Sequence, residues 1–335
     1  MKACVLKDKN KIDFEEVATP KPKDGEVLVK VLACGICSSD FNRVYKDSAY
    51  FFPIILGHEF SGQIVECGNG VDKSYCDKKV VVFPLLPCNE CEFCKEKHYA
   101  QCKNYSYFGS RQNGAMAEYI SVPLWNIKVI PDDMSCSVAA LGEPTAVAVH
   151  AVNKIENISE KTVCISGSGT IGILAGMIAM AKGADVAIVL RNDKKKSFLQ
   201  SLGFTKFVMN EDFDNSFDAV IECVGSNSSI SNSIKLVKSR GEIIFVGNPE
   251  SDISLDKKLY WKILRSEIVI KGIWNSSYKS DDIDDWDGAV EFLYNHQQKA
   301  NLLITDRFRL EDGIKAFEEV KNPSHISLKG VFENE

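Results

Sequence analysis

The chain has 335 residues, and at roughly 150 residues per domain this length predicts about two domains. Hydrophobic residues make up 45% and charged residues 26%, which is ordinary for a globular protein and excludes a disordered, collagenous or fibrous chain. The net charge of −6 gives no global basic field, so we expect neither nucleic acid nor a membrane as a partner. No apolar run reaches the ~18 residues of a membrane span, and the start of the chain lacks an apolar signal core, so we expect a cytoplasmic protein.

The first third of the chain is predicted to form short β-strands. Apolar or alternating segments, bounded by Gly, Pro and Asp, occupy residues 25–32, 62–67, 78–84 and 116–123. Short strands at this spacing favour a barrel or a sandwich over βαβ units.

Four of the 12 cysteines crowd into one short segment. The spacing Cys88-x2-Cys91-x2-Cys94-x7-Cys102 is typical of a tetrahedral zinc site, since cysteines this close cannot all pair as disulfides without severe strain. Four thiolates leave no open position on the ion, so we expect this zinc to be structural. Most of the other cysteines are expected to be small buried hydrophobic residues.

The pattern changes near residue 135. Residues 137–152 are helical in composition, and short apolar strands then recur at 161–166, 185–190, 218–223 and 242–246, with helical stretches between them. This alternation predicts a parallel, doubly wound sheet. From about residue 275 the pattern returns to mixed α and β.

A glycine-rich motif, Gly167-x-Gly169-x-x-Gly172, follows the first of these strands and opens a helix. This context predicts a dinucleotide site, because the glycines allow a tight turn and a close approach of the pyrophosphate to the helix N-terminus. An acid about 20 residues further on usually binds the ribose, but here Arg191 stands in that region. The arginine favours NADP(H) over NAD(H), while a solvated helix start remains the alternative. The predicted cofactor residues are Gly167, Gly169, Thr170, Ile171, Gly172, Arg191, Val246 and Trp274.

A second set of potential metal ligands is scattered through the first half of the chain. It comprises Cys37 with Asp40, His58 with Glu59, and Glu143 before a proline. Thiolate, imidazole and carboxylate groups bind zinc well, and a site with fewer than four protein ligands leaves a position for water or substrate. Spacing alone cannot join these pieces, because they lie far apart in the sequence.

Taken together, the Gly-His-Glu at 57–59, the cysteine cluster, the Glu-Pro pair at 143–144 and the glycine-rich motif resemble the zinc-dependent medium-chain alcohol and polyol dehydrogenases. The resemblance spans essentially the whole chain. It implies an α/β protein with a GroES-like β-rich catalytic domain at 1–150 and 275–335, and a Rossmann domain at 151–274. Residues 50–62, 84–88, 107–111, 262–265 and 272–275 are most similar to the branch that acts on galactitol 1-phosphate, although Gln112 and Asn113 stand where that branch commonly has Arg and Asp.

The resemblance also implies roles for individual residues. Cys37, His58 and Glu59 are expected to bind a catalytic zinc, with Glu143 as a further ligand, directly or through water. Asp40 would orient His58, and Ser39 would receive the alcohol proton. The implied reaction is reversible hydride transfer between a secondary alcohol of a polyol phosphate and a nicotinamide cofactor, with two zinc ions per chain.

Several interpretations stay open at this level. Ser110 and Arg111 are candidates for binding a substrate phosphate, and Asn275 for lining the pocket, but Arg111 is equally consistent with a surface turn. The alternatives are an unphosphorylated polyol such as sorbitol or xylitol, a pentitol phosphate, or a non-catalytic zinc- and nucleotide-binding protein; a zinc-free quinone reductase of the same fold would need neither metal cluster. Relatives form dimers and tetramers, so we expect a homo-oligomer, with residues 266–274 as either an edge strand or an interior strand.

Overall fold

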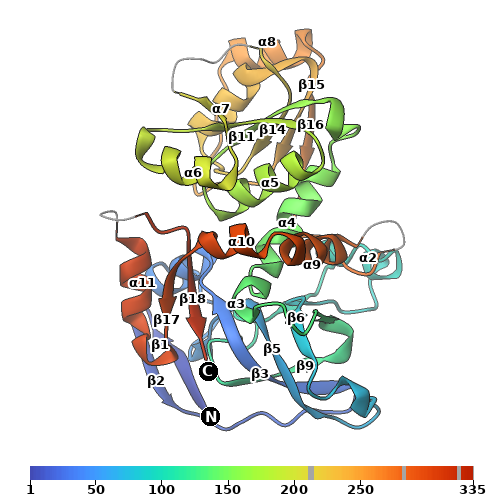
Figure 1. The fold of residues 1–335 in the computed structure, drawn as a ribbon, viewed down its shortest axis with the longest axis vertical. Coiled ribbons are helices and arrows are strands. Elements are labelled where there is room, and N and C mark those ends of the chain that lie inside the picture. The colour runs from blue at the N-terminus through green and yellow to red at the C-terminus, as the bar shows by residue number, and fades with distance from the viewer. Residues whose placement is uncertain (210–214, 281–283, 323–325, 335) are drawn as a thin grey trace. The chain divides into compact units, whose positions relative to one another are not determined.

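The computed structural model describes residues 1–209, 215–280, 284–322 and 326–334. The chain separates into two compact units, the first made of Met1–Glu143 and Ser277–Glu335 and the second of Pro144–Ser276 (Figure 1). Among the described residues no helix is both long and apolar enough to cross a membrane.

The first unit is built on β-sheets, as the sequence predicts. Its larger sheet has seven strands in the order β10-β6-β5-β3-β18-β17, with β9 also pairing with β3. These strands are β3 (Glu26–Gly35), β5 (Glu59–Cys67), β6 (Lys79–Val82), β9 (Tyr119–Pro123), β10 (Ile127–Val129), β17 (Ile304–Phe308) and β18 (Lys329–Glu333). A smaller sheet has the order β2-β1-β4, formed by β1 (Lys2–Asp8), β2 (Lys11–Glu16) and β4 (Ile54–Ile55). The predicted strands at 25–32, 62–67, 78–84 and 116–123 are confirmed as β3, β5, β6 and β9.

The C-terminal strands complete this unit, and Figure 1 shows β17 and β18 in red beside the blue N-terminal strands. Strand β18 runs antiparallel to β3, with Val331 opposite Gly35. Apolar side chains of β3, β5 and β18, among them Val29, Phe60 and Phe332, are fully buried in one core. This insertion brings residue 329 next to the start of β5, a contact between segments 270 residues apart.

The predicted helix at 137–152 is two helices in the structure, α3 (Cys136–Ala139) and α4 (Gly142–Asn153). The break falls at Ala140 and Leu141, and α4 begins at Gly142. Pro144 has no N–H to donate to the Ala140 carbonyl oxygen, as a continuous helix would require. The division between the two units falls inside α4, one residue after Gly142.

The second unit contains the predicted parallel sheet. Its six strands have the order β13-β12-β11-β14-β15-β16, and every adjacent pair is parallel. The strands are β11 (Thr162–Ser166), β12 (Asp185–Val189), β13 (Lys206–Val208), β14 (Phe217–Glu222), β15 (Val237–Phe245) and β16 (Val269–Gly272). The helices between them are α5 (Thr170–Ala181), α6 (Lys196–Leu202), α7 (Asn227–Leu236) and α8 (Lys257–Arg265). Because β16 ends the strand order among the described residues, the segment 266–274 is an edge strand and not an interior one.

Candidate metal and nucleotide sites

The first unit brings Cys37, His58 and Glu59 together. One potential ligand atom from each lies within 4.8 Å of the other two. Cys37 is the N-cap residue of α1 (Ser38–Tyr45), while His58 and Glu59 lie where β5 begins. Strand pairing places Glu59 opposite Gly35, and an added Cβ at Gly35 would lie 2.3 Å from Glu59 Oε2. The end of β3 and the start of β5 therefore approach closely enough to form one cluster, which the sequence spacing did not establish.

Residues in the first turn of α1 form hydrogen bonds around Cys37. The Cys37 backbone N–H donates to Asp40 Oδ2 over 3.1 Å, and the Ser39 hydroxyl lies 3.4 Å from Cys37 Sγ. Arg43, one turn along the helix, donates to Ser39 Oγ over 2.9 Å and to Asp40 Oδ1 over 3.1 Å. Arg43 was missed by the sequence analysis, although its spacing from Ser39 and Asp40 is that of neighbours on a helix surface.

His58 is buried and lies beside the fully buried Asp40, with 3.7 Å between Nδ1 and Oδ1. This separation is too long for a hydrogen bond, and Nδ1 has no such partner among the described residues. Burial by itself would lower the pKa of His58, but the negative charges of Asp40 and Cys37 raise it to about 10. The surroundings of the imidazole therefore favour a bound cation, either a proton or a metal ion.

Glu59 has a buried partner that the sequence analysis missed. Lys329, at the start of β18, places Nζ 2.6 Å from Glu59 Oε2 and 2.8 Å from Oε1, and it also donates to the Ile36 carbonyl oxygen over 3.1 Å. Both side chains are almost inaccessible to solvent. The signal in the sequence was a lysine at the start of an apolar C-terminal strand, but only the strand pairing shows which carboxylate it meets.

Glu143 is not part of the three-residue group but adjoins it. The Tyr107 hydroxyl donates to Glu143 Oε1 over 3.1 Å, and the Tyr107 ring packs edge-on against the His58 ring at 5.6 Å between centroids. Burial raises the pKa of Glu143, although the nearby His58 opposes the shift. This arrangement is compatible with binding to a metal directly or through water.

The donor set of this cluster fits zinc. Thiolate, imidazole and carboxylate are all zinc ligands, and three protein ligands are typical of a catalytic site that keeps one position open. The buried imidazole of His58 and the negative charges of Asp40 and Cys37 beside it also suit a cation.

The four cysteines Cys88, Cys91, Cys94 and Cys102 also converge, with their sulfur atoms within 4.8 Å of one another. Cys88 and Cys91 precede the short helix α2 (Glu92–Lys95), Cys94 lies within it, and Cys102 follows η2 (Tyr99–Gln101). Backbone N–H groups of Lys103 and Cys94 lower the pKa of Cys91 to about 6, whereas burial raises that of Cys94 to about 12. Four converging cysteine sulfurs with no open position fit a closed structural zinc site.

The glycine-rich motif of the second unit lies between β11 and α5. Gly167 has a φ of +124°, and an added Cβ at Gly172 would lie 2.0 Å from the Gly167 carbonyl oxygen. An added Cβ at Gly169 would meet no atom within 4 Å, so open space lies beside the backbone at that position. Thr170 and Ile171 begin α5, whose N-terminus supplies free N–H groups for a phosphate.

The other predicted cofactor residues lie at the carboxyl ends of neighbouring strands. Arg191 is exposed after β12, and the half-buried Lys195 donates to the Ser168 carbonyl oxygen in the glycine-rich loop over 2.9 Å. Val246 follows β15 and donates its N–H to the Glu222 carbonyl oxygen. Trp274 is 54% exposed after β16. The sequence analysis did not predict the contact of Lys195 with the loop.

The candidate substrate residues fall into two groups. Ser110 is buried and Arg111 lies against two tyrosine rings, with its Cζ 3.9 Å from the Tyr105 ring centre and 5.2 Å from that of Tyr50. Arg111 also donates to the Tyr105 carbonyl oxygen and to the Tyr50 hydroxyl. Asn275 belongs to the second unit, so the structure does not relate it to these residues.

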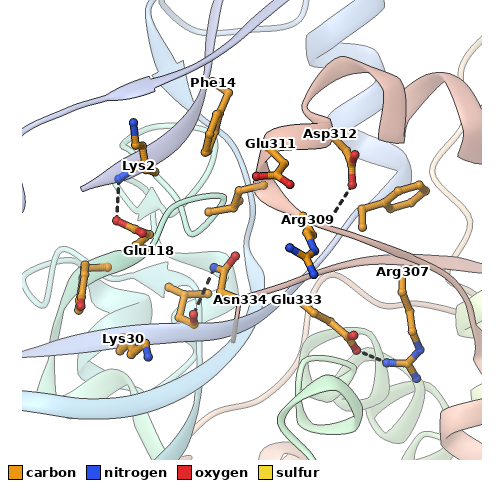
Figure 2. A pocket seen from close by; sticks show the side chains of 14 residues that line it. Lys2, Phe14, Lys30, Glu118, Arg307, Arg309, Glu311, Asp312, Glu333 and Asn334 are labelled. Carbon is orange, nitrogen blue, oxygen red and sulfur yellow. Dashed lines mark hydrogen bonds and ion pairs between the residues drawn. The ribbon is translucent and has the colours of Figure 1, made fainter.

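A separate pocket of about 820 Å³ opens on the first unit (Figure 2). None of the candidate ligand or substrate residues lines it. Figure 2 shows its charged groups in contact with one another, such as Arg307 with Glu333 and the Lys2 backbone with Glu118. It carries four cationic and four acidic side chains, so it offers no net charge to a ligand: Lys2, Lys30, Arg307, Arg309, Glu118, Glu311, Asp312 and Glu333.

Comparisons with known proteins match both units. A family model described as "Alcohol dehydrogenase GroES-like domain" matches residues 23–132, and one described as "Zinc-binding dehydrogenase" matches residues 170–295. Galactitol 1-phosphate 5-dehydrogenase of Escherichia coli K12 is 32% identical, over 96% of each chain. D-arabitol-phosphate dehydrogenase of Enterococcus avium is 31% identical over 94% of this chain and 92% of the relative, and sorbitol dehydrogenase of Bacillus subtilis is 30% identical over 98% and 96%.

Solved structures agree with this similarity. The crystal structure of galactitol-1-phosphate dehydrogenase from Escherichia coli matches with a TM-score of 0.91 and 30% identity, covering 100% of both chains. A zinc-binding dehydrogenase from Sinorhizobium meliloti 1021 bound to NADP matches with a TM-score of 0.89 and 25% identity over 99% of each chain.

Proposed function

Because the chain belongs to the zinc-binding alcohol and polyol dehydrogenases, we propose that it transfers a hydride reversibly between a secondary alcohol of a polyol phosphate and a nicotinamide cofactor, giving the keto sugar phosphate. The observation that carries this proposal is the buried group of Cys37, His58 and Glu59. A thiol, an imidazole and a carboxylate converge there with an orienting Asp40 and a compensating Lys329. A purely structural role would not require this set of donors.

Cys37, His58 and Glu59 hold the catalytic zinc in this proposal, with Glu143 as a further ligand, directly or through water. When bound, zinc supplies a Lewis acid that favours the alkoxide form of the alcohol, and the nicotinamide supplies the hydride acceptor. Asp40 orients His58 through its charge, since the 3.7 Å between Oδ1 and Nδ1 is too long for a hydrogen bond, whereas Lys329 holds Glu59 by hydrogen bonds. The ligands thus enter the reaction already positioned.

Ser39 receives the proton that the alcohol loses. Its hydroxyl oxygen accepts a hydrogen bond from Arg43 and lies 3.4 Å from Cys37 Sγ, so it is held at the edge of the ligand cluster. As the Ser39 oxygen takes this proton, its own hydroxyl proton passes to solvent, so the serine stays neutral, and the hydrogen bond from Arg43 holds the hydroxyl in place.

The substrate phosphate is assigned to Ser110 and Arg111. The turn at 107–111 links this site to the metal cluster, since Tyr107 contacts Glu143 and His58 while the Arg111 N–H donates to the Tyr107 carbonyl oxygen over 3.0 Å. Tyr105 and Tyr50 hold the Arg111 guanidinium, which has five N–H donors and uses two of its nitrogens in the contacts described. A fixed guanidinium with donors to spare suits a phosphate group. The names of the galactitol 1-phosphate and arabitol-phosphate relatives support the same substrate class.

NADP(H) is the proposed cofactor. Arg191 supplies a cation in the region where an acid commonly binds the ribose of NAD(H). Lys195 supplies a second cation, beside the glycine-rich loop. The repulsion between these two cations contributes, after burial, to lowering the pKa of Lys195. A 2′-phosphate would relieve that repulsion.

A homodimer is the proposed assembly, with β16 as the pairing strand. This edge strand and the adjoining α8 expose several large apolar side chains: Tyr260, Trp261, Leu264, Val269, Ile270 and Trp274. An unpaired strand edge flanked by such side chains is suited to association with a second copy. A monomeric mass in solution would contradict this part of the proposal.

Coenzyme reduction on zinc-quantified protein tests the function. Galactitol 1-phosphate, ribitol 5-phosphate, sorbitol and xylitol are each offered with NAD and with NADP. We expect turnover of a phosphorylated polyol with NADP, and Arg111→Gln should raise its KM about ten- to a hundredfold, the loss of a charged hydrogen-bonded contact. Arg240→Gln, at a surface position of the second unit, is the matched control.

The other outcomes discriminate among the alternatives. Activity on free polyols alone would contradict the phosphate-binding role of Ser110 and Arg111 but would still support a polyol dehydrogenase. A preference for NAD would overturn the role of Arg191 and Lys195. Inactivity on every substrate, with two zinc ions bound, would favour a non-catalytic zinc- and nucleotide-binding protein.

A further inference from the structure

Two cysteines outside both metal clusters lie against each other in the first unit. Cys67 ends β5, and Cys76 follows the short helix η1 (Lys73–Tyr75). Their sulfur atoms are 3.0 Å apart. Neither belongs to a group of three or more potential metal ligands within the described part of the chain, so the pair has no sign of a metal site.

Backbone hydrogen bonds hold this juxtaposition independently of the thiols. As the chain turns back after Cys76, the Asp77 N–H donates to the Ile64 carbonyl oxygen over 2.9 Å and the Ile64 N–H donates to the Lys78 carbonyl oxygen over 3.0 Å. The Asp72 carboxylate caps η1 by accepting from the Ser74 N–H over 2.8 Å. The return segment is thus fixed alongside β5, which keeps the backbones of Cys67 and Cys76 close together.

We propose that Cys67 and Cys76 form a reversible disulfide when a small-molecule disulfide is supplied. The sulfurs need to approach by only about 1 Å to reach the S–S bond length. Both residues are partly exposed, so an oxidant of this size can reach them.

The exchange balances in two steps. One cysteine thiolate attacks a sulfur of oxidised glutathione, which forms a mixed disulfide and releases one glutathione thiolate. The second cysteine then attacks the protein sulfur of that mixed disulfide, and the second glutathione leaves. The two cysteines lose two electrons to the small disulfide, and their two protons go to the released thiolates.

The bridge would join Cys67, at the end of β5, to Cys76, which follows η1. This end of β5 is the one opposite to Glu59. The bridge would close the loop from 67 to 76 and so restrict the unfolded chain, which stabilises the first unit. Burial and the adjacent Cys76 thiol raise the pKa of Cys67 to about 11, which makes this thiol a slow nucleophile at neutral pH. The reaction is therefore followed over hours.

The test uses the zinc-loaded, full-length protein with oxidised glutathione, followed by alkylation and proteolysis without reduction. We expect a peptide pair joined through Cys67 and Cys76, the loss of two hydrogen atoms from the protein mass, and a thermal midpoint a few degrees higher. Dithiothreitol should reverse all three changes.

Matched variants separate the bridge from general oxidation. Cys67→Ser should leave Cys76 carrying a glutathione, without the rise in thermal midpoint. Cys136→Ser, which removes a partly exposed cysteine elsewhere in the same unit, should form the bridge as the parent does. Recovery of Cys67 and Cys76 as separate alkylated or glutathione-bearing peptides from the parent protein would overturn the proposal, as would bridges from either one to another cysteine.

Discussion

The two candidate metal clusters of the first unit use cysteine in opposite ways. The four-cysteine cluster comes from one short segment, and two of its thiols, Cys88 and Cys91, are partly exposed. The other cluster joins one thiol to an imidazole and a carboxylate from separate segments, and its His58 and Glu59 are buried.

Their surroundings differ as well. Backbone N–H groups provide the largest stabilisation of the Cys91 thiolate, whereas buried charged side chains, Asp40 and Lys329, contact the ligands of the mixed cluster. This difference indicates that the first cluster fixes a local fold and that the second is organised for chemistry.

Cys37→Ser should abolish turnover and leave the fold intact. Removing a ligand should cost more than the about 10–100-fold typical of an outer-shell partner, so kcat/KM is expected to fall by over about 100-fold. Cys37 is a partly exposed helix cap, so the thermal midpoint should hardly change. Steady-state kinetics and calorimetry check this, with Cys136→Ser as the control. Substantial remaining turnover would remove Cys37 from the site.

Cys91→Ser should show the converse behaviour. A structural zinc contributes folding free energy directly, about 10–16 kcal/mol in small zinc peptides, so the first unit should lose several kcal/mol of stability. The measurement is denaturant unfolding of the zinc-loaded protein. An unchanged unfolding midpoint together with lost activity would mean that the two clusters have been assigned the wrong way round.

Lys329→Met should destabilise the protein and impair activity together. It leaves Glu59 buried without its cation, which costs about 3–5 kcal/mol in comparable buried pairs. Lys329→Arg retains the charge and should recover part of the loss. Equal stability of the Met variant and the parent would show that Glu59 has another counter-ion in the folded protein.

Asp40→Asn should separate positioning from stability. Asn keeps an acceptor for the Cys37 N–H but removes the charge beside His58, so kcat/KM or zinc affinity should fall about 10–100-fold. The pH–rate profile should shift as well, because the His58 environment changes, while thermal stability stays near that of the parent. A proportional fall in stability and activity would instead point to a purely structural Asp40.

Asp218→Asn, in the second unit, should change the free energy of unfolding less than Cys91→Ser or Lys329→Met does. Burial opposes the shift, but hydrogen bonds from Thr162 and Lys238 lower the pKa of Asp218 to about 2. Its folded-state pKa thus lies below the unfolded value, so its contribution to stability is present above about pH 4 and is lost as the pH falls through about 2. Since this side chain is one-third exposed, we expect less than about 1 kcal/mol at pH 7. Unfolding at pH 7 and at pH 3 checks it; a larger loss at the lower pH would contradict the sign.

The four-cysteine cluster and the glycine-rich loop could be predicted from the sequence because each is a local pattern. Spacing defines the thiols, and a strand followed by Gly167, Gly169 and Gly172 defines the loop. The mixed cluster could be proposed only through the family resemblance, since the pairing of β3 with β5 brings its parts together.

Other features depend on tertiary structure alone. Lys329 reaches Glu59 because β18 inserts beside β3, which no periodicity reveals. The contact of Cys67 with Cys76 likewise arises from the return of the chain alongside β5.

Zinc content per chain distinguishes the structural role of the four-cysteine cluster from the catalytic role of the mixed cluster. It is measured on the parent, Cys37→Ser and Cys91→Ser after identical purification. The account predicts two zinc ions in the parent and one in each variant, with the Cys37→Ser protein folded but inactive and the Cys91→Ser protein destabilised. A parent with one zinc, or a Cys37→Ser protein that retains two, would contradict it.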